Sequence, residues 1–134
     1  MNLWAAFIVA ALAAHAAAPE GFRSDSKRFG SSKMDIVITE TERHPRTSVL
    51  DIQVKAIGSS VGSSFFIACS LLDLARQRGN YRYIVKVEEL PRRGQMLVGF
   101  LQSADEAPET LDARFAGHKG FDLEQFAPLC DKMK

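Results

Sequence analysis

Alternating apolar and polar positions between residues 34 and 102 predict four β-strands around one long helix. Two alternating stretches, 34–41 and 50–56, are separated by His44-Pro45, which is typical of a connection because the residue before proline avoids helical geometry. Two more, 81–88 and 95–102, are joined by a turn at 91–94. Each strand should therefore pack one apolar face on a core.

The segment Ser64–Arg78 has the pattern of an amphipathic helix that Gly79 can close in the left-handed conformation. Its apolar residues fill one broad arc, which we expect to face the sheet: Phe65, Ile67, Ala68, Leu71, Leu72, Leu74 and Ala75. Phe66 and Cys69 fall outside this arc. Another segment should therefore cover them.

The order strand, strand, helix, strand, strand predicts an α+β fold with two layers, in which the helix lies on a mainly antiparallel four-stranded sheet. The pattern leaves the strand order open. A C-terminal helical segment is predicted from Asp122, with Pro128 kinking it or limiting its first piece to about a turn. We expect the part that carries Phe126, Leu129 and Cys130 to cover Phe66 and Cys69.

The overall composition indicates a single globular domain without a strong charge preference. Of the 134 residues, 46% are hydrophobic and 25% charged, and 17 Lys and Arg nearly balance 16 Asp and Glu. A chain without excess positive charge has no general attraction for phosphate backbones. Nucleic acid is therefore not an expected partner, and partners must be recognised by local features.

The N-terminus differs from this average, because Leu3–Ala18 contains no charged residue. This alanine-rich stretch is too short for a membrane span, which needs about 20 apolar residues, and Ala14-His15-Ala16 fits a signal-peptidase site. We predict that residues 1–16 are a signal peptide and that the mature protein is periplasmic or secreted, without a stable membrane anchor after cleavage. The alternative is an uncleaved or buried apolar helix.

The mature chain then divides into two predicted parts. Residues 17–33 are rich in Pro, Gly, Ser and basic residues, which predicts a flexible N-terminal tail. Residues 34–134 form the single α+β domain.

The two cysteines, Cys69 and Cys130, are predicted to form a disulfide, because paired cysteines in exported domains commonly act as staples. Closing so long a loop stabilises a domain by up to about 4 kcal/mol on the chain-entropy account. The alternative is a pair of buried free thiols.

Four serines in the GSSVGSS loop, Gly58–Ser64, are candidates for ligand binding: Ser59, Ser60, Ser63 and Ser64. The loop precedes a helix, whose backbone N–H groups and positive dipole end attract anions. It lacks the Walker A ending and the dinucleotide spacing. A connection with a serine cap accounts for the same residues.

His118 lies near acidic residues in a glycine-flanked loop and is the other candidate for chemistry. No histidine has a metal-ligand spacing, no CxxC motif occurs, and the serines lack an identifiable base. We therefore predict no catalytic residue, metal site or cofactor.

Basic residues on the second hairpin, Arg82, Lys86, Arg92 and Arg93, are candidates for contact with an envelope protein or an anionic envelope polymer. Interspersed Glu88 and Glu89 make a solvated face the alternative.

The stretch LLDLARQRGNYRYIVKVEE, in which a helix runs through a glycine into a tyrosine-rich strand, resembles a segment of small, mostly uncharacterised bacterial envelope proteins and lipoproteins. The element order over Met34–Gln102 is similar too. The resemblance implies a periplasmic or secreted accessory role and transfers no catalytic residue. The chain departs from the lipoproteins in having no cysteine for acylation.

We therefore expect a non-catalytic exported interaction domain that binds an envelope component through an open sheet face, a sheet edge or the basic hairpin. The alternative is a small exported enzyme or anionic-ligand-binding protein that uses the Gly58–Ser64 loop or the His118 region. A deep pocket that gathers these residues would favour the alternative.

Overall fold

The computed structural model describes residues 21–29 and 32–132, so the predicted signal peptide and its cleavage site lie outside the described residues. The strands are β1 (Arg23–Asp25), β2 (Asp35–Arg43), β3 (Thr47–Ala56), β4 (Tyr83–Glu88), β5 (Gln95–Leu101) and β6 (Phe121–Asp122). The α-helices are α1 (Ser60–Gly79) and α2 (Ala127–Lys132), and short 3-10 helices are η1 (Ser26–Phe29), η2 (Pro108–Thr110), η3 (Ala113–Phe115) and η4 (Leu123–Gln125).

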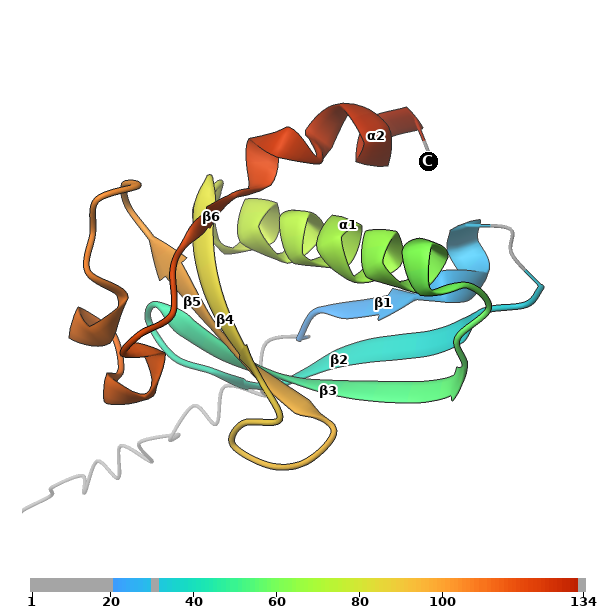
Figure 1. The fold of residues 1–134 in the computed structure, drawn as a ribbon, viewed down its shortest axis with the longest axis horizontal. Coiled ribbons are helices and arrows are strands. Elements are labelled where there is room, and N and C mark those ends of the chain that lie inside the picture. Colours follow the sequence, from blue (N-terminus) through green and yellow to red (C-terminus); the bar gives the residue numbers. More distant parts are fainter. Residues whose placement is uncertain (1–20, 30–31, 133–134) are drawn as a thin grey trace, which may run out of the picture.

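All the strands form one antiparallel sheet in the order β1-β2-β3-β5-β4-β6, and α1 crosses one of its faces (Figure 1). The predicted α+β class, the antiparallel pairing and the four longer strands are confirmed. The predicted number of strands is wrong, because the described residues form a sheet of 6 strands. The two additional strands are the short edges β1 and β6, which are too short to produce an alternating pattern.

β1 and η1 lie within the segment predicted to be a flexible tail, so among the described residues regular structure is present from Arg23 and not only from Met34. Buried serines fix this segment together with Phe22 and Phe29, which pack on the core. The Ser26 hydroxyl donates to the Met34 carbonyl (3.2 Å) and accepts from the Ile36 amide (2.9 Å). The segment is polar in composition but ordered in the structure, because its serine hydroxyl forms hydrogen bonds within the fold.

The main core lies between the sheet and α1. The strands contribute Ile36, Ile38, Leu50, Ile84, Val98 and Phe100, and α1 contributes Phe66, Leu71, Leu72, Leu74 and Ala75. Phe66 is fully buried, and its ring contacts that of Phe29 from η1 edge to face, with centroids 5.4 Å apart. The predicted arc is therefore rotated from the observed one. Phe65, Ile67 and Ala68 are only half-buried, and η1 provides a cover for Phe66.

The ends of α1 also differ from the prediction. The helix begins at Ser60, because the Ser59 side chain caps it by accepting from the Gly62 amide (2.9 Å). It ends at Gly79, and Asn80 caps it: Asn80 adopts the left-handed conformation that was predicted for Gly79 (φ 57°) and donates its N–H to the Arg76 carbonyl.

A smaller core covers part of the opposite face of the sheet, where Phe115 of η3 packs on Val85, Leu97 and Leu101. Gly99 makes this contact close, since a Cβ at this position would lie 2.7 Å from a ring carbon of Phe115. The segment from η2 to η3 therefore shields the face that the helix does not cover.

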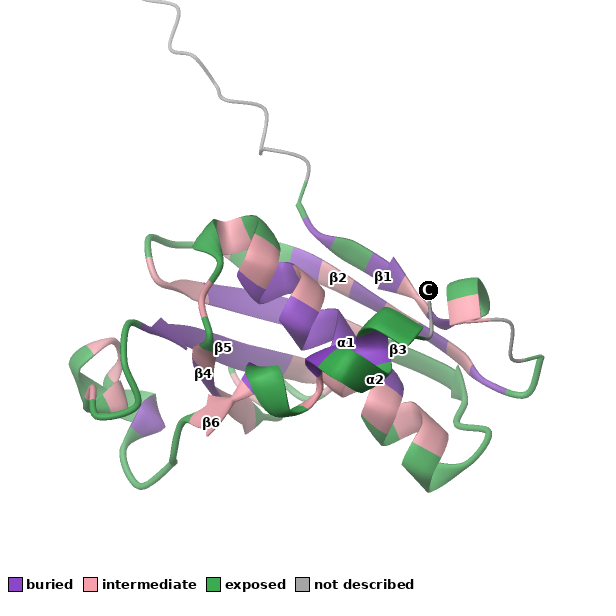
Figure 2. Cartoon of the chain, turned by 90° about the horizontal axis from the view of Figure 1, so that it is seen from above, coloured by how far each residue is buried: buried purple, intermediate pink, exposed green. Residues whose placement is uncertain are grey.

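The C-terminal segment lies against α1 on the side away from the sheet (Figures 1 and 2). The predicted disulfide is confirmed: Cys69 and Cys130 are bonded across 61 residues, with Cα atoms 5.4 Å apart and both side chains buried. The helical segment predicted from Asp122 consists of two short pieces, η4 and α2, and Pro128 lies in the first turn of α2, where proline is tolerated. Leu129, expected to be part of the cover, is 47% exposed.

Candidate functional site

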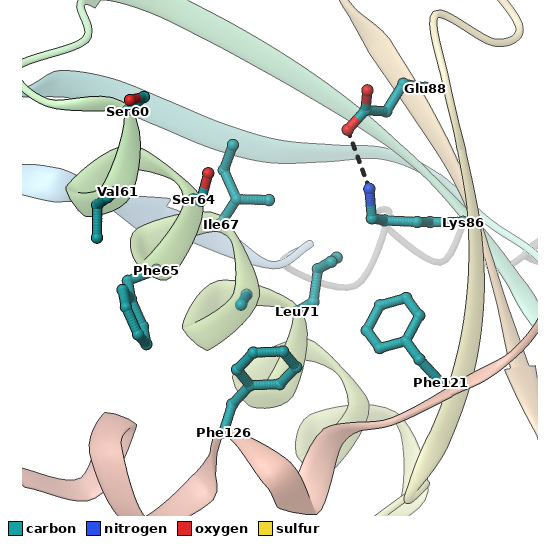
Figure 3. A pocket seen from close by; sticks show the side chains of 11 residues that line it. Ser60, Val61, Ser64, Phe65, Ile67, Leu71, Lys86, Glu88, Phe121 and Phe126 are labelled. Atoms are coloured by element: carbon teal, nitrogen blue, oxygen red, sulfur yellow. Dashed lines mark hydrogen bonds and ion pairs between the residues drawn. The ribbon is translucent and has the colours of Figure 1, made fainter.

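An open cleft of about 650 Å³ lies between the N-terminal half of α1, β4 and the C-terminal segment. The side chains that surround it come from all three (Figure 3): Ser60, Val61, Ser64, Phe65, Ile67, Ala68, Leu71, Lys86, Glu88, Phe121 and Phe126. Most of these residues are apolar. The cleft therefore exposes apolar surface that the core does not use.

The half-buried residues Phe65, Ile67 and Ala68, which the core does not cover completely, form the α1 wall of this cleft. Phe121 in β6 and Phe126 at the end of η4 form another wall. Phe126 is held by the turn that leads into α2, because its carbonyl accepts from the Cys130 amide (2.9 Å). The disulfide at Cys130 thus anchors the segment that carries this wall.

Lys86 and Glu88 of β4 provide charged groups at the side of the cleft. Their side chains form an ion pair (2.9 Å) that is partly open to solvent (31% and 65% exposed). An exposed pair of this kind adds little stability. It remains available for exchange with charges on a bound molecule.

The outer edge of β4 is open beside the cleft. β6 pairs only with the N-terminal end of β4, where Ile84 lies opposite Phe121, and the ladder stops there. The chain that leads into β6 arrives from η3 on the other face of the sheet (Figure 1). Residues 85–88 therefore have no strand on their outer side among the residues described.

Backbone geometry shows which groups this edge presents. The Leu123 amide donates to the Arg82 carbonyl (2.9 Å), so the main-chain groups of Arg82 point toward β6. Because the hydrogen-bonding direction of a strand alternates, Ile84, Lys86 and Glu88 present their N–H and C=O groups to the same side. The main-chain groups of Lys86 and Glu88 are thus directed outward at the mouth of the cleft.

The four candidate serines belong to the cap and first turns of α1 and not to a free loop. Ser59 is the cap, and the Ser63 hydroxyl donates to the Ser60 carbonyl (3.1 Å), so both hydroxyls already have partners in the helix. Ser60 and Ser64 line the cleft. The structure therefore brings two of the four serines to the candidate site.

The candidate basic residues do not form one patch. Arg82 binds Asp122 with two hydrogen bonds (3.0 and 2.9 Å), and Lys86 pairs with Glu88. Arg92 and Arg93 are exposed at the turn between β4 and β5. Half of the predicted cationic surface is therefore neutralised by neighbouring carboxylates.

His118 is exposed in the loop before β6, and its amide donates to the Phe115 carbonyl (3.0 Å). Within residues 21–29 and 32–132, no three His, Cys, Asp or Glu side chains gather as a metal site would require. His118 is not among the residues that line the cleft.

A buried charge network lies at the other end of α1. The Glu40 carboxylate accepts from Arg43 (2.6 Å) and the Phe22 amide (3.2 Å), and it also binds Ser48. Arg78 reaches the same group and donates to Ser48 (2.6 Å). Burial alone would raise the pKa of Glu40, but the hydrogen bonds from Arg43, Ser48 and Phe22 and the charge of Arg43 hold the pKa below its ordinary value.

This network fastens structural elements together and leaves the Glu40 side chain only 1% exposed. Arg78 also donates to backbone carbonyls of the β2–β3 turn, and its guanidinium lies 4.9 Å from the centre of the Phe100 ring. The donors and acceptors named here bind one another and join β2, β3 and the end of α1. The network is therefore a structural tie and not a binding site.

The cleft was not predicted from the sequence. Its walls combine residues that are distant along the chain, and Phe121 and Phe126 lie in short elements with no regular apolar period. The available signal was the pair of phenylalanines in the predicted C-terminal segment.

Comparison of the chain with known protein families, with curated proteins and with solved structures gives no match. The resemblance of residues 71–89 to envelope proteins therefore stays an expectation. In the described part of the chain, no helix is long and apolar enough to cross a membrane.

Proposed function

We propose that this protein is a non-catalytic interaction domain of the bacterial envelope, exported to the periplasm or secreted, which binds an apolar segment of another envelope protein in the cleft. The observation that carries this proposal is the cleft itself. Its volume of about 650 Å³ is in the range of binding sites for specific ligands, which is roughly 300–1,000 Å³. Exposed apolar surface of this kind marks interaction sites.

The polar groups of the cleft support binding more than catalysis. They are the hydroxyls of Ser60 and Ser64 and the ion pair of Lys86 with Glu88. No histidine is among the described residues that line the cleft, and its two other basic groups, the Lys86 amine and the Glu88 carboxylate, are paired with each other and not with either serine.

The disulfide supports the exported location. Disulfides persist in oxidising compartments outside the cytoplasm and are rare within it. The buried Cys69–Cys130 bond is consistent with the signal peptide that the sequence predicts.

Selection of random peptides on phage, followed by affinity measurements on the selected peptides by fluorescence anisotropy, tests the proposal. The key variant is Ala68→Phe, which fills the cleft from α1. We expect it to weaken binding by at least about tenfold, equivalent to about 1.4 kcal/mol. The matched control is Ala116→Phe, which adds the same bulk at an exposed position after η3 and should leave the affinity unchanged. Failure to select any peptide, or equal affinity in the two variants, would reject the proposal.

A further inference from the structure

We infer that the segment bound in the cleft is an extended strand that pairs with the open outer edge of β4 and places alternate apolar side chains in the cleft. This inference rests on the proposed function and adds the conformation and chemical pattern of the partner.

Main-chain hydrogen bonding is the first argument. The ladder between β4 and β6 ends at Ile84, and the N–H and C=O groups of Lys86 and Glu88 continue along the same side. An incoming strand would meet donors and acceptors already aligned by the pairing of β4 with β5. This is the arrangement in which an extended peptide adds to a sheet edge.

The position of the cleft is the second argument. In the register of the sheet, Lys86 lies opposite Val98 and Glu88 opposite Met96, so both side chains lie on the face that carries α1. Cross-strand neighbours share a face. Partner residues opposite Lys86 and Glu88 would therefore also point toward α1, into the space bordered by Ile67 and Phe121.

These two constraints define the partner's chemistry. Side chains that enter the cleft are separated by two positions, because a strand alternates between its faces. Apolar side chains suit the phenylalanine and aliphatic walls. A charge on the partner close to Lys86 or Glu88 can exchange with their exposed ion pair.

A second copy of this chain fits the cleft less well than such a partner. If two copies paired through their β4 edges, each would present its own Lys86 and Glu88 on the α1 face beside the other copy's cleft. An apolar cleft does not compensate charged groups for lost hydration. A strand whose alternate side chains are apolar can pair with the same edge without burying charged groups.

The substitution Lys86→Pro tests the pairing. Proline removes the outward N–H of residue 86 and leaves the hydrogen bonds to β5 intact, because prolines are tolerated at the free side of edge strands. Lys86→Ala removes the same side chain but keeps the N–H, so we expect Lys86→Pro to weaken binding of the selected peptides at least about tenfold more than Lys86→Ala does. Near-ultraviolet circular dichroism and thermal unfolding establish that each variant keeps its fold.

Peptides methylated at single backbone nitrogens provide a test that does not depend on any variant folding. Methylation at alternate positions, whose N–H groups face β4, should weaken binding at least about tenfold, and methylation at the positions between them should have little effect.

The outcomes separate this inference from the proposed function. Binding that Ala68→Phe blocks but that tolerates both Lys86→Pro and every backbone methylation would overturn the strand pairing and keep the cleft as the site. A dimer in sedimentation velocity that Lys86→Pro converts to monomers would overturn it in favour of a second copy. An alternating methylation pattern together with sensitivity to Lys86→Pro supports it.

Discussion

The Glu40 carboxylate joins β2, β3 and the end of α1, and its side chain is almost completely withdrawn from water. Removing one partner of a buried ionic network leaves the other charge without compensation. Glu40→Ala would leave Arg78, only 6% exposed, without its carboxylate.

We therefore expect Glu40→Ala to lower the free energy of unfolding by about 3 kcal/mol, measured by urea denaturation. Glu42→Ala is the matched control, because Glu42 is exposed and its ion pair with the exposed His44 is long, at 3.5 Å. It should change the free energy by no more than about 0.5 kcal/mol. Equal losses in the two variants would contradict the role assigned to the network.

The Glu40 carboxylate should also make the stability of the protein depend on pH. The pKa of Glu40 is lower in the folded protein than its ordinary value of 4.5. Between the two pKa values the unfolded chain binds a proton that the folded chain does not, so acid favours unfolding. The contribution of Glu40 is complete above pH 4.5 and is lost as the pH falls through the folded pKa.

The difference in unfolding free energy between the wild type and Glu40→Gln should therefore shrink as the pH is lowered below 4.5. This comparison is necessary because the pKa values of Glu106, Asp112 and Asp122 are also lowered, by hydrogen bonds from arginines, and contribute to acid unfolding in both proteins. A difference that is constant from pH 7 to pH 3 would show that Glu40 does not titrate in this way.

Single residues were predictable where their chemistry depends on few neighbours. The bond between Cys69 and Cys130 was inferred from an even cysteine count and a predicted export signal. The Glu40 network was not predictable, because Arg43 and Arg78 are ordinary charges in the sequence and meet Glu40 only when the end of α1 packs over the β2–β3 turn.

At the scale of elements, the C-terminal segment depends on the disulfide. α2 has only 6 residues, too few for a stable isolated helix, and its contact with α1 is covalently fixed at Cys130. The bond closes a long loop and contributes up to about 4 kcal/mol.

The double variant Cys69→Ser with Cys130→Ser should therefore release the C-terminal segment before the sheet unfolds. Limited proteolysis followed by mass spectrometry should show early cleavage after β6 in the variant and a resistant fragment that retains β2 to β5. In the unreduced wild type, the mature chain should be lighter by two hydrogens than the reduced one. Two freely alkylated thiols in native protein would contradict the bond.

The turn between β4 and β5 should contribute little to stability, because Arg92 and Arg93 are exposed at its tip. The double variant Arg92→Ala with Arg93→Ala should keep the free energy of unfolding within about 0.5 kcal/mol of the wild type. Thermal unfolding provides the measurement. A large fall in melting temperature would mean that these side chains support the hairpin.

The length of each element explains whether it was predicted from the sequence. The four long strands and α1 produce a period over many residues, and their existence was correctly predicted. β1 and β6 have 3 and 2 residues, and no period is recognisable over so short a length. The face of α1 was misplaced because the helix is covered on more than its sheet side, by Phe29 of η1 as well as by the C-terminal segment.

At the scale of the whole molecule, the cleft depends on the order of strands in the sheet. β5 lies between β3 and β4, which leaves β4 near the edge, and the short β6 covers only its first residues. α1 and the C-terminal segment then enclose the space beside the uncovered part (Figures 1 and 3). Strand order was open at the level of sequence, so a site that depends on it could not be predicted.

The proposed export and the proposed binding should be linked through the disulfide. Phe126 forms part of the wall of the cleft, and its carbonyl accepts a hydrogen bond from the Cys130 amide. Release of α2 therefore removes the constraint on the Phe126 ring. We expect peptides that bind the oxidised protein to bind the Cys69→Ser, Cys130→Ser variant at least about tenfold more weakly, since ordering the released segment costs free energy on binding. Isothermal titration calorimetry measures this difference, and the wild type with reduced thiols should behave like the variant. Equal affinity in the oxidised and reduced proteins would show that the cleft does not need its C-terminal wall, and binding would then give no reason for the protein to work in an oxidising compartment.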